Sequence, residues 1–168
     1  MINDERMVAF INSFDKGNTS FLNQIEKEAR ADAVPIIRTE TQTLLRFLMA
    51  AHRPMEILEV GTAVGFSALL MQEYAPAGAH VTTIEKYEKR IPIARENFKR
   101  AGKEDTITFL CGDATEILKE LQGEYDFIFM DAAKAQYIHF LPEVTRLLKK
   151  GGLLVSDNVL QDGDVLES

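Results

Sequence analysis

The 168-residue chain has a single cysteine, Cys111, and therefore cannot form an internal disulfide. Disulfides are a feature of oxidising compartments, so we expect this protein to work in the reducing cytoplasm. Cys111 lies in an apolar, strand-like stretch, and we expect its side chain to serve packing. At this length a chain can bury a hydrophobic core without disulfides or structural zinc.

Long apolar runs are also missing, and no stretch approaches the ~20 consecutive apolar residues that a membrane-spanning helix needs. Residues 1–6 include two acids and do not resemble a secretory signal. No low-complexity linker divides the sequence. We therefore expect one domain over residues 1–168 and no membrane segment.

Positive charge is in the minority, because 19 Lys and Arg residues stand against 26 Asp and Glu residues, a formal net charge of −7 at pH 7. This balance disfavours indiscriminate binding to nucleic acids. One basic segment nevertheless contains Lys86, Lys89, Arg90, Arg95, Lys99, Arg100 and Lys103, interspersed with Glu88, Glu96 and Glu104. We interpret it as a solvated helix face, with a phosphate-contacting patch as the alternative.

Hydrophobic periodicity predicts helices in the first part of the chain, residues 1–54. Periodic stretches cover residues 5–14 and 20–31, and a third begins at Thr39. Thr39 with Gln42 three residues later resembles a capping box.

Residues 55–168 follow a different pattern, in which strand-like and helix-like stretches alternate. The apolar strand-like stretches lie at 55–60, 81–84, 107–110, 127–130 and 153–156. Such alternation indicates βαβ units, whose strands run parallel. The predicted fold is α/β and Rossmann-like, with a mainly parallel sheet, helices on both faces and N-terminal helices before it.

Acidic residues stand at the ends of the five strand-like stretches: Glu59, Glu85, Asp113, Asp131 and Asp157. In an open parallel sheet, ligands bind in the crevice beyond the carboxyl ends of the strands. Acids that recur at these ends would converge on one place. The pattern therefore predicts a ligand site at this edge of the sheet.

The segment after the first stretch, residues 59–67, is rich in small residues. Gly61 and Gly65 allow a tight turn and close approach to a ligand, while the next helix offers free amides and Ser67 a hydroxyl. The spacing is not Gly-x-Gly-x-x-Gly, so it favours a nucleoside with an amino-acid tail over a dinucleotide. Taken alone, this segment is explained equally well as a structural strand-to-helix turn.

The next two strand ends suggest the rest of an adenosine site. Glu85 is well placed to accept both hydroxyls of a ribose. Asp113, followed by Ala114, would receive the adenine amino group or would instead cap the helix that follows it.

The last two strand ends combine three hard oxygen donors, Asp131, Asp157 and Asn158, with the amine of Lys134. Oxygen donors of this kind suit a divalent cation, and three are too few to fill an octahedral shell, which leaves room for water and a bidentate substrate. The alternatives are a helix cap at Asp131, a turn at Asp157 and Asn158, and a salt bridge at Lys134.

From about Pro35 to Val159 the chain resembles the cation-dependent class I O-methyltransferases, the family of catechol and caffeoyl-coenzyme A O-methyltransferases. Its bacterial branch includes transfer RNA 5-hydroxyuridine methyltransferases. The matching motifs are Glu59-Val60-Gly61-Thr62 with Ser67, Glu85, Asp113-Ala114, Asp131-Ala132-Ala133-Lys134-Ala135-Gln136-Tyr137 and Ser156-Asp157-Asn158-Val159. The last two motifs together separate this family from other Rossmann-like proteins.

The resemblance implies two binding sites. For S-adenosylmethionine it implies Ile37, Glu59, Gly61, Thr62, Ser67, Glu85, Asp113, Ala114 and Asp131. For a divalent cation, Mg or alternatively Mn or Ca, it implies the ligands Asp131, Asp157 and Asn158. It also implies catalytic roles for Lys134 and Asp131. Residues 35–38 contain no distinctive side chain that would fix the register of Ile37.

The implied reaction is methylation of a metal-bound hydroxyl next to a second oxygen, with Lys134 accepting the hydroxyl proton. The substrate would be a catechol-like or phenolic small molecule or 5-hydroxyuridine in tRNA. Two other functions remain open: a nicotinamide-dependent oxidoreductase, against which the missing third glycine argues, and a cofactor-binding domain without catalysis.

Family members continue past the Asp-Asn motif into further strands, whereas this chain ends at Ser168. We therefore expect that carboxyl-terminal strands are missing. An exposed sheet edge favours pairing with another subunit, so a homodimer is expected.

Overall fold

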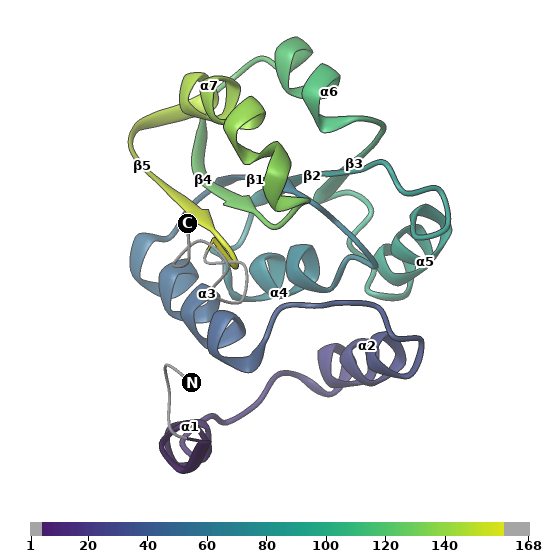
Figure 1. Cartoon of the computed structure of the whole chain (residues 1–168), viewed down its shortest axis with the longest axis vertical. Helices are drawn as coiled ribbons and strands as arrows, with labels where there is room; N and C mark the ends of the chain where they lie inside the picture. The colour runs from purple at the N-terminus through teal and green to yellow at the C-terminus, as the bar shows by residue number, and fades with distance from the viewer. Residues whose placement is uncertain (1–4, 160–168) are drawn as a thin grey trace.

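The computed structural model describes residues 5–159, except for the side chains of Glu5, Ile11 and Lys134 (Figure 1). The elements, in chain order, are α1 (Glu5–Asn12), α2 (Ser20–Ala31), α3 (Thr39–His52), β1 (Glu56–Val60), α4 (Phe66–Tyr74), β2 (His80–Glu85), α5 (Ile91–Arg100), β3 (Ile107–Cys111), α6 (Ala114–Glu120), β4 (Tyr125–Met130), the 3-10 helix η1 (Lys134–Gln136), α7 (Tyr137–Leu147) and β5 (Leu148–Ser156). The expectation that carboxyl-terminal strands are missing concerns the end of the chain, and residues 160–168 lie outside the described residues.

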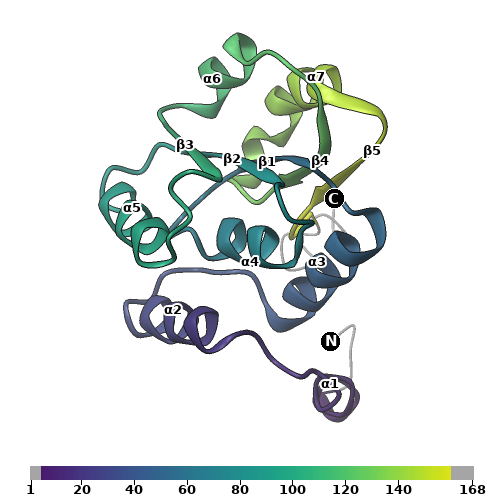
Figure 2. The same ribbon diagram turned by 180° about the vertical axis from the view of Figure 1, so that it is seen from behind.

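The five strands form one parallel sheet in the order β3-β2-β1-β4-β5. Helices α6 and α7 cover one face, and α3, α4 and α5 cover the other, with α2 beneath them (Figures 1 and 2). The predicted α/β fold with helices on both faces is therefore confirmed. The strand order reverses at β1, whose neighbours are β2 and β4, and this is where open parallel sheets bind ligands.

Two apolar cores lie on the two faces of the sheet, because successive residues of a strand point to opposite sides. In β1, Ile57 packs with α2, α3 and α4, whereas Leu58 and Val60 pack with α6 and α7. A strand that is apolar on both faces reads as a continuous hydrophobic run, which is why the strands were visible in the sequence. Glu59 alternates with Leu58 and Val60 and so faces the α4 layer.

Helix α3 begins at Thr39 as predicted, but the predicted capping box is wrong. The residue before the helix is Arg38, and no side chain caps this end. Gln42 is buried and instead donates from Nε2 to the Ile37 carbonyl at 3.1 Å, while its Oε1 accepts from Asn18 at 2.7 Å. Gln42 therefore fastens the segment that enters α3.

The packing role expected for Cys111 is also wrong. Cys111 is exposed at the end of β3, which has only one neighbouring strand in the described sheet. Its Sγ accepts a hydrogen bond from Arg95 Nη2 at 3.2 Å. Within residues 5–159, no helix combines the length and apolar character needed to cross a membrane.

Candidate functional site

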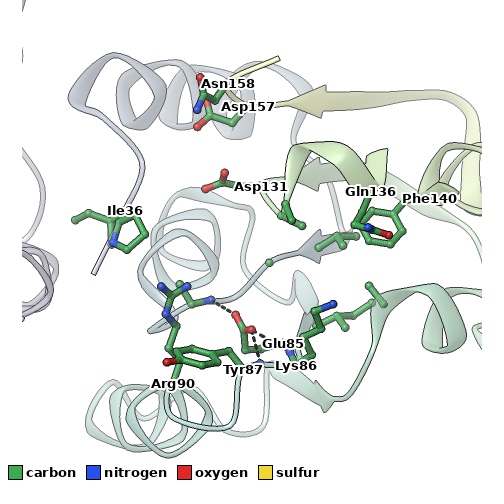
Figure 3. A pocket seen from close by; sticks show the side chains of 18 of the residues that line it. Ile36, Glu85, Lys86, Tyr87, Arg90, Asp131, Gln136, Phe140, Asp157 and Asn158 are labelled. Atoms are coloured by element: carbon green, nitrogen blue, oxygen red, sulfur yellow. Dashed lines mark hydrogen bonds between the residues drawn. The ribbon is translucent and has the colours of Figure 1, made fainter. Parts of the chain in front are cut away.

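A cavity of about 690 Å³ opens at the carboxyl ends of the strands (Figure 3). It is lined by Pro35, Ile36, Arg38, Thr41, Val60, Gly61, Ala63, Ile84, Glu85, Lys86, Tyr87, Arg90, Gly112, Asp113, Ala114, Asp131, Ala132, Ala133, Gln136, Phe140, Asp157 and Asn158. Seven predicted site residues are among them: Gly61, Glu85, Asp113, Ala114, Asp131, Asp157 and Asn158. Four of the five strand-end acids therefore converge on this cavity, whereas Glu59 does not line it.

Gly61 is the point where the loop after β1 crosses the end of β4. A side-chain carbon at this position would lie 2.2 Å from the Asp131 carbonyl oxygen, and the residue has a φ of +109°. The amides of Gly61 and Thr62 donate to the Ile84 carbonyl at 3.0 and 3.1 Å, which ties the loop to β2 as well. Only glycine fits this turn without strain.

Glu85 ends β2 with a carboxylate that three backbone amides hold in place. Its Oε2 accepts from Ala63 at 2.7 Å, and its Oε1 accepts from Lys86 at 2.9 Å and Tyr87 at 2.8 Å (Figure 3). A carboxylate has about four lone-pair sites, so these three bonds leave acceptor capacity. The group is thus fixed in orientation and still able to accept a hydroxyl from a ligand.

Asp113 is the N-cap of α6, which is the capping alternative raised by the sequence. Its Oδ1 accepts from the Thr115 amide at 2.8 Å, and Oδ2 lies 3.2 Å from Lys86 Nζ. The hydrogen bond from the Thr115 backbone, helped by the Thr115 hydroxyl and the Lys86 charge, lowers the pKa of Asp113. Ala114, next along the chain, also faces the cavity.

Glu59, Thr62 and Ser67 are buried beneath the loop and are not among the residues that line the cavity. Glu59 Oε2 accepts from Thr83 Oγ1 at 2.5 Å, and that hydroxyl lies 2.6 Å from the hydroxyl of Thr62. Within residues 5–159, Glu59 Oε1 has no hydrogen-bond partner. These groups form a polar layer between the loop and the core.

Burial raises the pKa of the Glu59 carboxyl to about 7. The hydroxyls of Ser67 and Thr83 oppose this shift, while the negative charges of Asp131 and Glu85 add to it. Glu59 is fully buried, so removal of its charge from water dominates.

Ile37, predicted to touch the cofactor, is buried in the core at 3% exposure, and its neighbour Ile36 lines the cavity instead. Residues 35–38 contain no distinctive side chain, so the sequence did not fix which of these two isoleucines faces the cavity. The chain enters α3 with Ile37 turned toward α2 and α4, as part of the core that contains Leu22 and Leu69.

Asp131, Asp157 and Asn158 lie at the end of the cavity opposite Glu85 (Figure 3). The Asp131 amide donates to the Val60 carbonyl and the Asp157 amide to the Met130 carbonyl, each at 2.9 Å. Asn158 has a positive φ of 53°, a left-handed conformation that asparagine adopts more readily than most other residues. Lys134 begins η1, but its side chain is outside the described part of the structure.

The oxygen set fits a hard divalent cation in its chemistry. Two carboxylates and one amide are the donors that Mg²⁺ and Ca²⁺ accept. Among the described residues there is no group of three or more His, Cys, Asp or Glu side chains placed to hold a metal ion. A site here would therefore need the Asn158 amide and ligands from outside the chain.

Several cavity residues were not predicted as site residues, although Lys86 and Arg90 belong to the basic segment. Lys86 and Tyr87 directly follow Glu85, so their position next to a strand-end acid could have identified them as site residues. The Arg90 guanidinium lies over the Tyr87 ring at 5.2 Å and extends this wall. Thr41 comes from α3, far from the strands in sequence, and no local pattern marks it.

Comparisons with known proteins identify relatives of this chain. A family model described as O-methyltransferase matches residues 13–168. A catechol O-methyltransferase from Niastella koreensis is 35% identical over 127 residues, which cover 73% of this chain and 58% of the relative. A catechol O-methyltransferase from Mycobacterium tuberculosis is 31% identical over 161 residues, which cover 94% of this chain and 73% of the relative.

The crystal structure of SAH-bound Podospora anserina methyltransferase PaMTH1 superposes with a TM-score of 0.91 at 30% identity. The match covers 96% of this chain and 72% of that structure. The chain thus spans 58% to 73% of the length of these three proteins. With the family model matching most of its residues, the chain belongs to the O-methyltransferase family that its strand-end motifs predicted.

Proposed function

We propose that this protein is an S-adenosylmethionine- and divalent-cation-dependent O-methyltransferase, which methylates a hydroxyl that has a second oxygen beside it. The proposal rests on one observation, namely that two different kinds of polar group lie at the two ends of the cavity. A fixed ribose-type acceptor, Glu85, lies at one end, and the oxygen donors Asp131, Asp157 and Asn158 lie at the other (Figure 3). One cavity therefore offers places for two reactants.

The residues around Glu85 would hold the methyl donor. Glu85 would accept the ribose hydroxyls, and Ala114 and Phe140 offer apolar surface in the same cavity for the adenine. Glu59, Thr62 and Ser67 would support the loop from below. S-adenosylmethionine supplies an activated methyl group when bound.

Asp131, Asp157 and Asn158 would hold the cation, most simply Mg²⁺. When bound there, a divalent ion would supply Lewis acidity that lowers the pKa of a substrate hydroxyl. Lys134, three residues after Asp131, would accept the hydroxyl proton. The chain's own contribution would be mainly to position two reactants, so that the deprotonated hydroxyl oxygen attacks the methyl carbon in line with the sulfur, which leaves as S-adenosylhomocysteine.

We favour a catechol-like or phenolic small molecule as substrate, in line with the names of the two catechol O-methyltransferases above. A 5-hydroxyuridine in tRNA is the second candidate, because Lys86 and Arg90 of the basic segment line the cavity itself. Against it, Lys86 pairs with Asp113, and Arg100 pairs with Glu28 at 2.8 Å. These two basic side chains are therefore partly neutralised by acids of the chain itself.

Calorimetric titration with S-adenosylmethionine, with Mg²⁺ and after chelation, tests the donor and cation sites together. We expect saturable binding of the methyl donor, and catechol binding only with the cation present. Transfer of a labelled methyl group to catechol and to hydroxyuridine-containing tRNA, side by side, identifies the substrate class. A protein that does not bind S-adenosylmethionine would refute the proposal.

Glu85→Gln is expected to weaken S-adenosylmethionine binding by about 10-fold to 100-fold, because hydrogen bonds to a charged group contribute about 1.5–3 kcal/mol. The matched control is Glu88→Gln, an exposed acid three residues along that does not line the cavity. Calorimetry measures both variants. Equal affinities for Glu85→Gln and wild type would exclude the ribose role.

A further inference from the structure

Thr41 reaches from α3 to the end of β5. Its Oγ1 donates a hydrogen bond to Asp157 Oδ1 at 3.1 Å, between residues 116 positions apart in the sequence. Thr41 is half-buried and lines the cavity. This contact joins a helix that precedes the sheet to a carboxylate at the last strand end.

The helix that carries Thr41 is firmly anchored. Gln42, the next residue, is buried and bonded to the Ile37 carbonyl, and Leu45 and Met49 are fully buried one and two turns further on. Thr41 is β-branched, so its own χ1 angle is restricted. The hydroxyl is therefore presented from a rigid support and not from a mobile loop.

The backbone of Asp157 is held from the opposite side. Its amide donates to the Met130 carbonyl at 2.9 Å, and its carbonyl accepts from the Tyr137 hydroxyl at 3.3 Å. The single proton of this hydroxyl is shared with the Met130 carbonyl, which lies nearer, at 2.8 Å. With the main chain fixed, the remaining freedom of Asp157 is rotation of its side chain, and the Thr41 hydrogen bond limits that rotation.

We propose that Thr41 is a positioning residue for the Asp157 carboxylate. It binds Oδ1 and leaves Oδ2 outside this hydrogen bond, so the carboxylate is oriented before a cation arrives. The inference rests on the proposed cation dependence. Removal of a residue that hydrogen-bonds to a metal ligand lowers metal affinity by roughly 10-fold to 100-fold. For a single neutral hydroxyl we expect a loss near the lower value.

Binding of Mn²⁺, followed by its electron paramagnetic resonance signal without substrate, tests the role of Thr41 directly. Thr41→Val keeps the shape and removes the hydroxyl, and we expect its Mn²⁺ affinity to fall by about tenfold. Thr41→Ser restores the donor and should return to within about twofold of wild type. In turnover, Thr41→Val should require more cation for half-maximal rate, with little change in kcat at saturating cation.

Thr43→Val is the matched control on the same helix. Its hydroxyl shares one proton between Asp15 Oδ2 at 2.9 Å and the Thr39 carbonyl at 3.0 Å, and Thr43 does not line the cavity. Mn²⁺ affinity should be unchanged in this variant, and S-adenosylmethionine affinity should be unchanged in all three. Wild-type Mn²⁺ affinity in Thr41→Val would overturn the positioning role alone, whereas a wild-type protein that binds no Mn²⁺ would overturn it together with the proposed cation dependence.

Discussion

Gly61→Ala is expected to destabilise the fold by about 2–5 kcal/mol and to abolish measurable S-adenosylmethionine binding, because backbone strain and overpacking each cost about 1–3 kcal/mol. The added carbon would lie 2.2 Å from the Asp131 carbonyl oxygen, which is backbone and cannot rotate away. The ends of β1 and β4 would have to separate. Denaturant unfolding measures the stability loss, and calorimetry measures the binding loss.

Gly102→Ala provides the control for this substitution. Gly102 also has a positive φ, of 63°, but an added carbon there would meet no atom within 4 Å. We expect a loss of only about 1 kcal/mol from the left-handed conformation, with binding intact. Similar losses in the two variants would show that the contact with Asp131 is not the cause.

Glu59→Gln is expected to stabilise the protein at alkaline pH. The carboxyl has a pKa of about 7 in the folded chain against an ordinary 4.5, mainly because burial disfavours its charge. The folded state therefore binds the proton more tightly than the unfolded state. Its stabilising contribution is complete below pH 4.5 and is lost as the pH rises toward 7 and beyond.

A shift of this size corresponds to about 3 kcal/mol, at 1.36 kcal/mol for each pKa unit. Glutamine cannot ionise, so the stability difference between variant and wild type should grow by about this amount from about pH 4.5 to about pH 8.5. Denaturant unfolding of both proteins across this range measures the difference, in which shifts common to both cancel. A difference that stays constant with pH would contradict the raised pKa.

The strands were predictable because each is a short apolar run flanked by turn-forming residues. Only β5 was predicted much too short, to residues 153–156, whereas it begins at Leu148. Its first part contains the exposed Lys149 and Lys150 and two glycines, and its pairing with β4 shifts register between Tyr125 and Phe127. An irregular, solvent-facing strand gives no apolar pattern to detect.

The acids of the site were predictable for a different reason, since parallel strands bring their carboxyl ends to one edge. Contacts between distant segments were not. The turn that places Ile36 in the cavity and Ile37 in the core depends on packing against α2 and α4, and the Thr41–Asp157 hydrogen bond depends on where α3 crosses the sheet. These are tertiary effects that no local periodicity records.

The two ends of the cavity are formed at strands that differ greatly in how far they are buried from solvent. All of β1 and β2 beyond their first residues is buried, whereas β5 contains no fully buried residue and is one of the two edge strands of the described sheet. Fraying begins where few apolar contacts oppose it, so β5 should exchange its amide hydrogens sooner than the central strands. Such an opening would remove Asp157 and Asn158 and leave Glu85 in place. The molecule would then pass through a form that retains Glu85, the proposed ribose acceptor, but has lost two of the groups proposed to hold the cation.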